Sequence, residues 1–218
     1  MTEDQLSELW AFARGDRVAL DFEKWFLSQN DLEGTLGEDL HWSLASANYG
    51  NRDEVWKLRK ALAAKLEPTK QCECMSVRDL GVVPMGCDGL DERTFATLER
   101  IKEYGGKLWW LYISKCNVCR EHWMIAQDER IYDNYYLKRL QPSEADDILN
   151  GGGWPDDFIT YERVLKLGRT LSQPWTFSDP RSPSLVWTAD DLRNERPDIT
   201  IEEIAYLLAI SPAEAALL

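Results

Sequence analysis

The sequence predicts an α+β protein with helical N- and C-terminal regions around a small antiparallel sheet. Three observations predict this fold class. Residues 1–67 carry apolar side chains at helical spacing, residues 68–141 contain short aromatic and β-branched runs, and residues 142–218 return to helical patterns. A length of 218 residues permits one large domain or two small ones. We expect the three regions to form one compact unit.

The N-terminal region predicts four helices. The first begins at Thr2, which has Gln5 three residues further on, as in a capping box, and it ends at Gly15. Apolar side chains fall on one face of this segment at helical spacing, and the next segment repeats the pattern. The other three helices are expected at residues 18–28, 37–50 and 52–66.

The middle region predicts strands with one helix inserted among them. Residues 71–89 combine short apolar runs with Gly and Pro, which is typical of strands and turns. Residues 91–106 follow a helical pattern that ends at two glycines. The segment 107–116 is aromatic and β-branched and predicts a strand, with further strands at 122–133 and 135–140.

The C-terminal region predicts short helices separated by a linker. Helical patterns cover residues 142–152 and 156–171. The segment 172–187 holds three prolines and four serines, and we interpret it as a linker or a surface arm. Residues 188–218 predict further short helices.

The last helices raise the question of DNA binding. ITIEEIAYLLAISPAEAALL resembles the first part of a helix-turn-helix. However, PAEAALL offers no Arg, Lys, Asn or Gln to reach a base edge or a phosphate. We therefore expect a helical hairpin that packs on the body of the protein.

The charge of the chain limits its partners. The formal net charge is -13, and residues 141–218 alone hold 14 acidic against 6 basic side chains. Such acidity disfavours nucleic acid, because attraction to phosphates comes from Lys and Arg. The acidic start MTEDQLSELW is unlike a secretory signal, and no apolar run approaches the roughly 20 residues that span a bilayer. We expect a cytoplasmic protein that engages neither nucleic acid nor membrane.

The cysteines form the most informative pattern. There are five, Cys72, Cys74, Cys87, Cys116 and Cys119, and an odd number argues against a disulfide framework. CEC and CNVC supply two closely spaced pairs, and zinc is commonly held by four ligands in such pairs on turns. We predict a structural Zn²⁺ bound by four thiolates, with the CNVC at a hairpin tip. The metal ligands are expected to be Cys72, Cys74, Cys116 and Cys119.

Other interpretations of the cysteines stay open. The thiols could be buried side chains, or CNVC could be a redox pair, although such pairs normally begin a helix and here a strand precedes it. A catalytic zinc site would need an open position, and His122 is the local histidine that could replace a cysteine. Cys87 is expected to pack as a small apolar residue, with a ligand role as the alternative.

No catalytic motif is apparent in the chain. GxSxG, a phosphate-binding Gly-rich loop and HExxH are all absent, and His41 and His122 are the only histidines. Asp128, Glu129 and Asp133 are close in sequence, and we interpret them as a solvated strand edge. We expect no catalytic residues and no small-molecule substrate.

Part of the N-terminal region resembles a known class of proteins. Residues 9–62 present an aromatic helix, the pattern F-x-x-G, an F-E-x-W helix and then L-E-x-x-L-G-E-D-L. This quarter of the chain resembles the start of small bacterial immunity proteins of the colicin and polymorphic-toxin type. Residues 108–133 also look like a zinc-ribbon segment.

The resemblance implies a function without catalysis. Immunity proteins bind a cognate protein toxin and block its active site or its access to substrate. The acidity fits a toxin such as a nuclease, whose cleft is basic. The acidic C-terminal region and the N-terminal helices are the two candidate contacts. Their acidic residues are Glu33, Glu38, Asp39, Asp146, Asp147, Asp156, Asp157, Asp190 and Asp191.

Two other functions stay open beside toxin neutralisation. The first is a zinc-dependent enzyme, which would need a position on the metal for water. The second is an adaptor or transcriptional regulator that uses the C-terminal helices.

Overall fold

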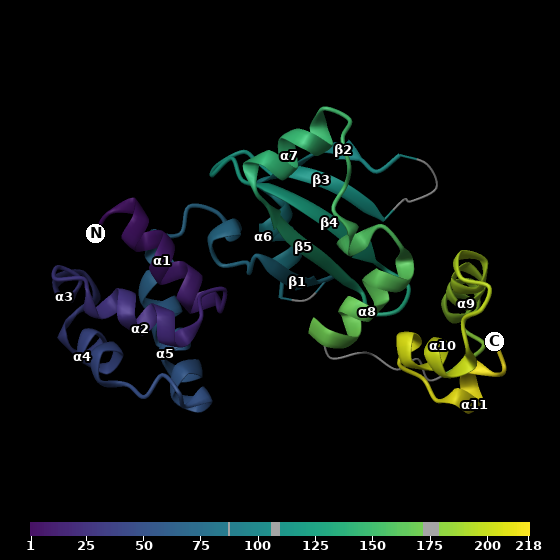
Figure 1. Ribbon diagram of the computed structural model, residues 1–218, viewed down its shortest axis with the longest axis horizontal. Helices are drawn as coiled ribbons and strands as arrows, with labels where there is room; N and C mark the ends of the chain where they lie inside the picture. The colour runs from purple at the N-terminus through teal and green to yellow at the C-terminus, as the bar shows by residue number, and fades with distance from the viewer. Residues whose placement is uncertain (87, 106–109, 172–178) are drawn as a thin grey trace. The chain divides into compact units, whose positions relative to one another are not determined.

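The computed structural model describes residues 1–86, 88–105, 110–171 and 179–218. Helices accompany a five-stranded antiparallel sheet, so the predicted α+β class is confirmed. The chain divides into two compact units, Met1–Asp79 and Leu80–Leu218. The strands and the C-terminal helices therefore belong to the same unit (Figure 1).

The first unit is helical, as its apolar periodicity predicts. Its first helix begins with the expected capping box, in which the Thr2 hydroxyl accepts from the Gln5 amide at 3.2 Å and the Gln5 side chain accepts from the Thr2 amide at 2.8 Å. Gly15 ends that helix with a φ of +91°, a conformation that suits glycine. The α-helices are α1 (Glu3–Arg14), α2 (Ala19–Leu27), α3 (Glu33–Leu36), α4 (Glu38–Ser46) and α5 (Arg52–Leu66).

Aromatic side chains pack against one another in the core of this unit. The rings of Phe12 and Phe22 stack with their centroids 3.8 Å apart, and Tyr49 lies against both rings.

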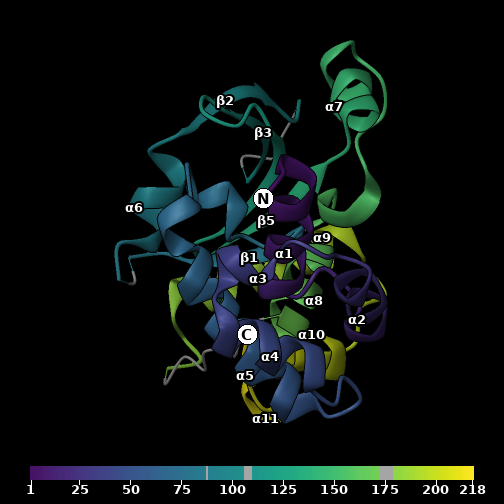
Figure 2. The same ribbon diagram turned by 90° about the vertical axis from the view of Figure 1, so that its left-hand side faces the viewer.

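Two single-turn 3-10 helices follow α5, η1 (Glu67–Thr69) and η2 (Glu73–Met75). The helices of this unit are drawn in purple to blue in Figure 2.

The sheet of the second unit has the strand order β1-β5-β4-β3-β2, and every neighbouring pair is antiparallel. The central strands are buried along almost their whole length, whereas β2 at one edge is mostly exposed. The strands are β1 (Leu80–Pro84), β2 (Leu98–Glu103), β3 (Leu111–Cys116), β4 (His122–Asp128) and β5 (Asn134–Leu140).

The predicted helix over residues 91–106 is only half correct. Helix α6 covers Leu90–Phe95, and the chain then forms the edge strand β2, which pairs Leu98 with Cys116 and Glu103 with Tyr112. Leu, Glu, Arg and Lys favour a helix locally, but pairing with the buried strand β3 outweighs that preference. A register shift between Arg100 and Lys102 marks this irregular edge.

Helices lie on both faces of the sheet. Successive residues of a strand point to opposite faces, so Tyr135 and Tyr136 of β5 mark the two sides. Phe95, the last residue of α6, contacts the Tyr135 ring at a centroid distance of 4.5 Å, whereas Gly168 of α8 lies against Tyr136. Figure 1 shows α8 and α6 on these two sides.

The C-terminal helices complete the core on the α8 side. They are α7 (Pro142–Leu149), α8 (Tyr161–Leu171), α9 (Pro183–Glu195), α10 (Ile201–Leu208) and α11 (Pro212–Ala215), with the 3-10 helix η3 (Asp156–Phe158) before α8. The predicted linker 172–187 is wrong in its last part, because Pro183 is the first residue of α9, a position that tolerates proline. Residues 172–178 of that prediction lie outside the described residues.

The final hairpin packs into this core, as expected. Ile204, Leu208 and Ala215 are buried with the residues of the sheet, and the Tyr132 hydroxyl donates to the Leu207 carbonyl. Helix α11 has only four residues, so it does not form a recognition helix. Within the described ranges, no helix has both the length and the apolar character needed to cross a membrane.

Candidate metal centre

The CNVC pair lies in the turn between β3 and β4, at the hairpin tip that the sequence predicts. Cys116 is the last residue of β3, and its amide donates to the Glu121 carbonyl at 2.9 Å. The Arg120 amide donates to the Cys116 carbonyl at 3.1 Å, and Arg120 has a φ of +67°. These bonds close a tight turn that holds Cys119 near Cys116.

A neighbouring segment supports this turn. Thr97 lies between α6 and β2, and its carbonyl accepts from the Asn117 amide at 2.8 Å. The Thr97 hydroxyl oxygen lies 3.5 Å from the Cys116 sulfur, where a thiolate would accept the hydroxyl proton. Sequence reasoning missed Thr97, because it is nineteen residues from Cys116 and no local pattern marks it.

The CEC pair is held by a single turn of 3-10 helix. Cys72 is extended with a φ of -154°, and its carbonyl accepts from the Met75 amide at 3.3 Å. The Glu73 carboxylate accepts from Lys70 at 3.0 Å and from the Ser76 hydroxyl at 2.9 Å. Glu73 therefore braces the segment that carries the two cysteines. Its place between them in the sequence was the one available signal.

The four predicted ligands lie together. The Sγ atoms of Cys72, Cys74, Cys116 and Cys119 are all within 4.8 Å of one another. Tetrahedral coordination with metal–sulfur bonds of about 2.3 Å would separate the sulfurs by roughly 3.8 Å, so the cluster needs only a small contraction around an ion. Three of these side chains are buried and Cys119 is half-buried. The residues present fit a metal ion.

Of the alternative ligands, the one that the structure describes is not brought to this cluster. His122, which could have replaced a cysteine, begins β4 and is not a member of the group. The pKa of His122 is lowered, first by burial and then by the neighbouring Lys115. The prediction for Cys87 lies outside the described residues.

The acidic partner-binding candidates are all exposed, but they differ in their surroundings. Four of the six C-terminal aspartates are ion-paired within the second unit, whereas no ion pair is found for Asp146 and Asp147 among the described residues. The N-terminal residues Glu33, Glu38 and Asp39 likewise have no ion pair within the described ranges. The paired ones are Asp156 with Arg163, Asp157 with Lys138, Asp190 with Arg193 and Asp191 with Arg130.

The expected solvated strand edge is wrong for Asp128, which is completely buried. Its carboxylate accepts from the backbone amides of Arg130, Ile131 and Tyr132 and from the Tyr161 hydroxyl at 2.6 Å. Burial raises the pKa of Asp128, and these hydrogen bonds oppose that shift. All these bonds stabilise the turn after β4, which gives Asp128 a structural role.

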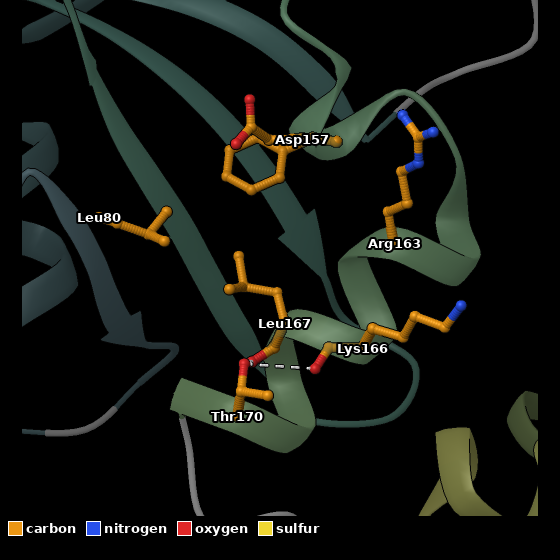
Figure 3. Close-up of a pocket in the computed structure, with 7 residues that line it drawn as sticks. Leu80, Asp157, Arg163, Lys166, Leu167 and Thr170 are labelled. Carbon is orange, nitrogen blue, oxygen red and sulfur yellow. Dashed lines mark hydrogen bonds between the residues drawn. The ribbon is translucent and has the colours of Figure 1, made fainter.

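A hollow of about 220 Å³ in the second unit carries two cations (Figure 3). Arg163 pairs with Asp156 at 3.0 Å, and Lys166 pairs with Glu162 at 2.7 Å. The figure shows both cationic side chains extending away from Leu80 and Leu167. Their charges are compensated within α8 and its preceding turn, so this hollow is a weak candidate for a site.

In comparisons with known proteins, no protein-family model, curated protein or solved structure matches the chain.

Proposed function

We propose that the chain is a non-enzymatic immunity protein that binds and neutralises a cognate protein toxin, and that Cys72, Cys74, Cys116 and Cys119 hold a structural zinc ion. The resemblance of residues 9–62 to immunity proteins and the net charge of -13 support toxin binding. The toxin class that fits the charge best is a nuclease, because an acidic inhibitor is steered to a basic cleft.

The cysteine cluster supports a structural metal. Four thiolates satisfy the tetrahedral coordination of zinc, and then no position remains for a reactive water. Zinc also accords with a site made only of sulfur ligands, for which the common alternative is iron. When bound, the ion would join segments separated by 41 residues of sequence between Cys74 and Cys116.

The observation that carries the toxin-binding proposal is the exposed surface of α4. Trp42 is 64% exposed, which is unusual for so large an apolar side chain. Glu38 and Asp39 lie four and three residues before it, so the three side chains share one side of the helix. Among the described residues, neither carboxylate has an ion pair. A tryptophan beside uncompensated acids is the composition expected of a contact with a basic protein.

A hollow beside these side chains also makes this part of α4 suitable for binding a partner protein. Helices α4 and α5 line a hollow of about 420 Å³ that includes Leu40, Ser43 and Leu58. We name Glu38, Asp39 and Trp42 the α4 surface, and we propose it as the toxin contact in preference to the C-terminal aspartates, most of which are already ion-paired.

The test is co-expression with the product of the adjacent open reading frame. We expect the chain to rescue growth and to co-purify with that product. The charge reversal Glu38→Lys with Asp39→Lys should slow association, and Trp42→Ala should weaken the complex by about 2 kcal/mol or more.

Two matched controls locate the contact. Trp187→Ala removes a tryptophan of similar exposure, 60%, and Asp146→Lys with Asp147→Lys reverses two C-terminal acids that have no ion pair in the part of the chain that the structure describes. Both should leave binding unchanged. A lack of rescue and of complex formation by the native chain would refute the proposed function, and loss of binding only in the C-terminal variants would refute the α4 surface.

A further inference from the structure

A second hollow in the first unit is cationic, although the chain as a whole is acidic. It has a volume of about 400 Å³ and lies where the end of α1 meets α5. Four basic side chains line it, together with Gly15 and Trp56. The basic residues are Arg14, Arg59, Lys60 and Arg78.

The Asp16 side chain lies close to two of these basic side chains. The Asp16 carboxylate pairs with Arg14 and lies 3.6 Å from the Nε atom of Arg78. Arg14 also donates to the Met75 carbonyl at 3.2 Å, and Arg78 donates to the Gly15 carbonyl at 3.4 Å. Arg14 also pairs with Asp79 at 3.4 Å. Two carboxylates therefore stand against four basic side chains, which leaves the hollow with a net positive charge.

Arg59 is the third guanidinium group at the hollow. It has no carboxylate partner among the described residues, and one of its terminal nitrogens donates to the Arg17 carbonyl at 3.1 Å. Its Nε is buried and makes no hydrogen bond. Burial lowers the pKa of Arg59 first, the nearby Arg78 lowers it further, and Asp16 opposes the shift. A buried guanidinium nitrogen without an acceptor costs free energy that a bound anion would recover.

Trp56 supplies an aromatic surface at the same hollow. Its side chain is 59% exposed, and the Lys60 ammonium lies 5.1 Å from the ring centroid. An exposed indole can stack on a nucleobase, and arginine forks match the geometry of phosphate oxygens. The volume is also within the usual range for small-molecule sites, roughly 300–1,000 Å³.

We propose that this hollow binds a nucleotide, with its phosphate on Arg59 and Arg78 and its base on Trp56. A cationic group alone would accept any anion, and the exposed tryptophan is what favours a phosphate that carries an aromatic base. Nucleotide binding here is separate from toxin binding, because the hollow and the α4 surface share no residue.

The test measures binding of adenosine 5′-monophosphate, inorganic phosphate and adenosine to the purified full chain by calorimetry at low salt. We expect adenosine 5′-monophosphate to bind most tightly, phosphate more weakly and adenosine weakest. Arg78→Gln, a change at a half-exposed side chain, should weaken nucleotide binding about tenfold, because a hydrogen bond to a charged group is lost. Trp56→Ala should remove the preference for the nucleotide over phosphate.

Two control variants keep the test specific. Trp42→Ala removes the comparably exposed tryptophan of α4, and Lys24→Gln removes a cation of α2 that is 79% exposed. Both should bind the nucleotide within twofold of the native chain. Absence of binding at millimolar nucleotide would overturn the proposal, as would equal affinity for native, Arg78→Gln and Trp56→Ala chains.

Discussion

At the scale of single residues, buried polar groups hold the turns of the sheet. Asp128, the last residue of β4, is fully buried, and its two oxygens accept from three backbone amides and one phenol. Such a carboxylate is stabilising only while all its donors are present, because an unsatisfied buried group costs about 1–3 kcal/mol.

Replacing Asp128 should therefore lower stability in a graded way. In Asp128→Asn the amide nitrogen would stand where one oxygen accepts from the Tyr132 amide, so we expect a loss of about 1–3 kcal/mol. Asp128→Ala, which removes both acceptors, should cost more. Chemical denaturation measures the effect, and Glu129→Gln at an exposed neighbouring position is the control. Equal stability of the Asn and native chains would contradict this role.

Thr97 offers a test of the contacts that support the proposed metal ligands. Thr97→Val keeps the shape of the side chain and removes the hydroxyl that lies 3.5 Å from the Cys116 sulfur. Loss of such a supporting contact typically lowers metal affinity by about 10–100-fold. Competition with a chelator measures the affinity, and Val118→Ala, an exposed change inside the same turn, should leave it unchanged. An affinity equal to that of the native chain would show that the hydroxyl is not needed.

At the scale of elements, the local sequence predicts most helices and strands but not every change between them. The first unit follows its apolar periodicity, and the capping box at Thr2 forms as expected. The edge strand β2 was not predictable, because Leu98–Glu103 has helical propensity and becomes a strand only by pairing with β3. The start of α9 was not predicted, because Pro183 was interpreted as part of a linker. Proline is tolerated in the first turn of a helix, but the local sequence does not show that a helix begins there.

Close packing of α8 on the sheet gives a prediction at this scale. A Cβ at Gly168 would lie 2.4 Å from a ring atom of Tyr132 and 2.6 Å from the Tyr136 hydroxyl. Gly168→Ala should force these rings apart and destabilise the chain by about 1–3 kcal/mol, despite the better helix propensity of alanine. Gly34→Ala in α3, where nothing lies within 4 Å, should be neutral or slightly stabilising under the same thermal unfolding measurement. Equal effects of the two changes would contradict the packing described.

At the scale of the whole molecule, the two cysteine pairs were readable from the sequence because their spacing is a property of each turn. Their convergence is a property of the fold, and it places the four sulfurs within 4.8 Å. The cationic hollow was not predictable, since its residues come from α1, α5 and the segment before β1, and a net charge of -13 gives no sign of it. Charge totals describe a chain, whereas sites depend on which charges the fold brings together.

Metal binding should be linked to stability. Because the four cysteines come from distant parts of the chain, binding of an ion would be coupled to folding of the surrounding segments. Cys116→Ser should lower the melting temperature, and adding a strong chelator to the native chain should lower it comparably while leaving the Cys116→Ser chain unaffected. A melting temperature that responds to neither change would exclude a structural metal.

The most direct measurement is elemental analysis of the chain purified under reducing conditions without chelator. We predict one zinc per chain, and almost none in Cys74→Ser and Cys116→Ser chains that represent the two pairs. Absence of stoichiometric metal, iron in place of zinc, or full zinc content in either variant would contradict a zinc site formed by the four cysteines.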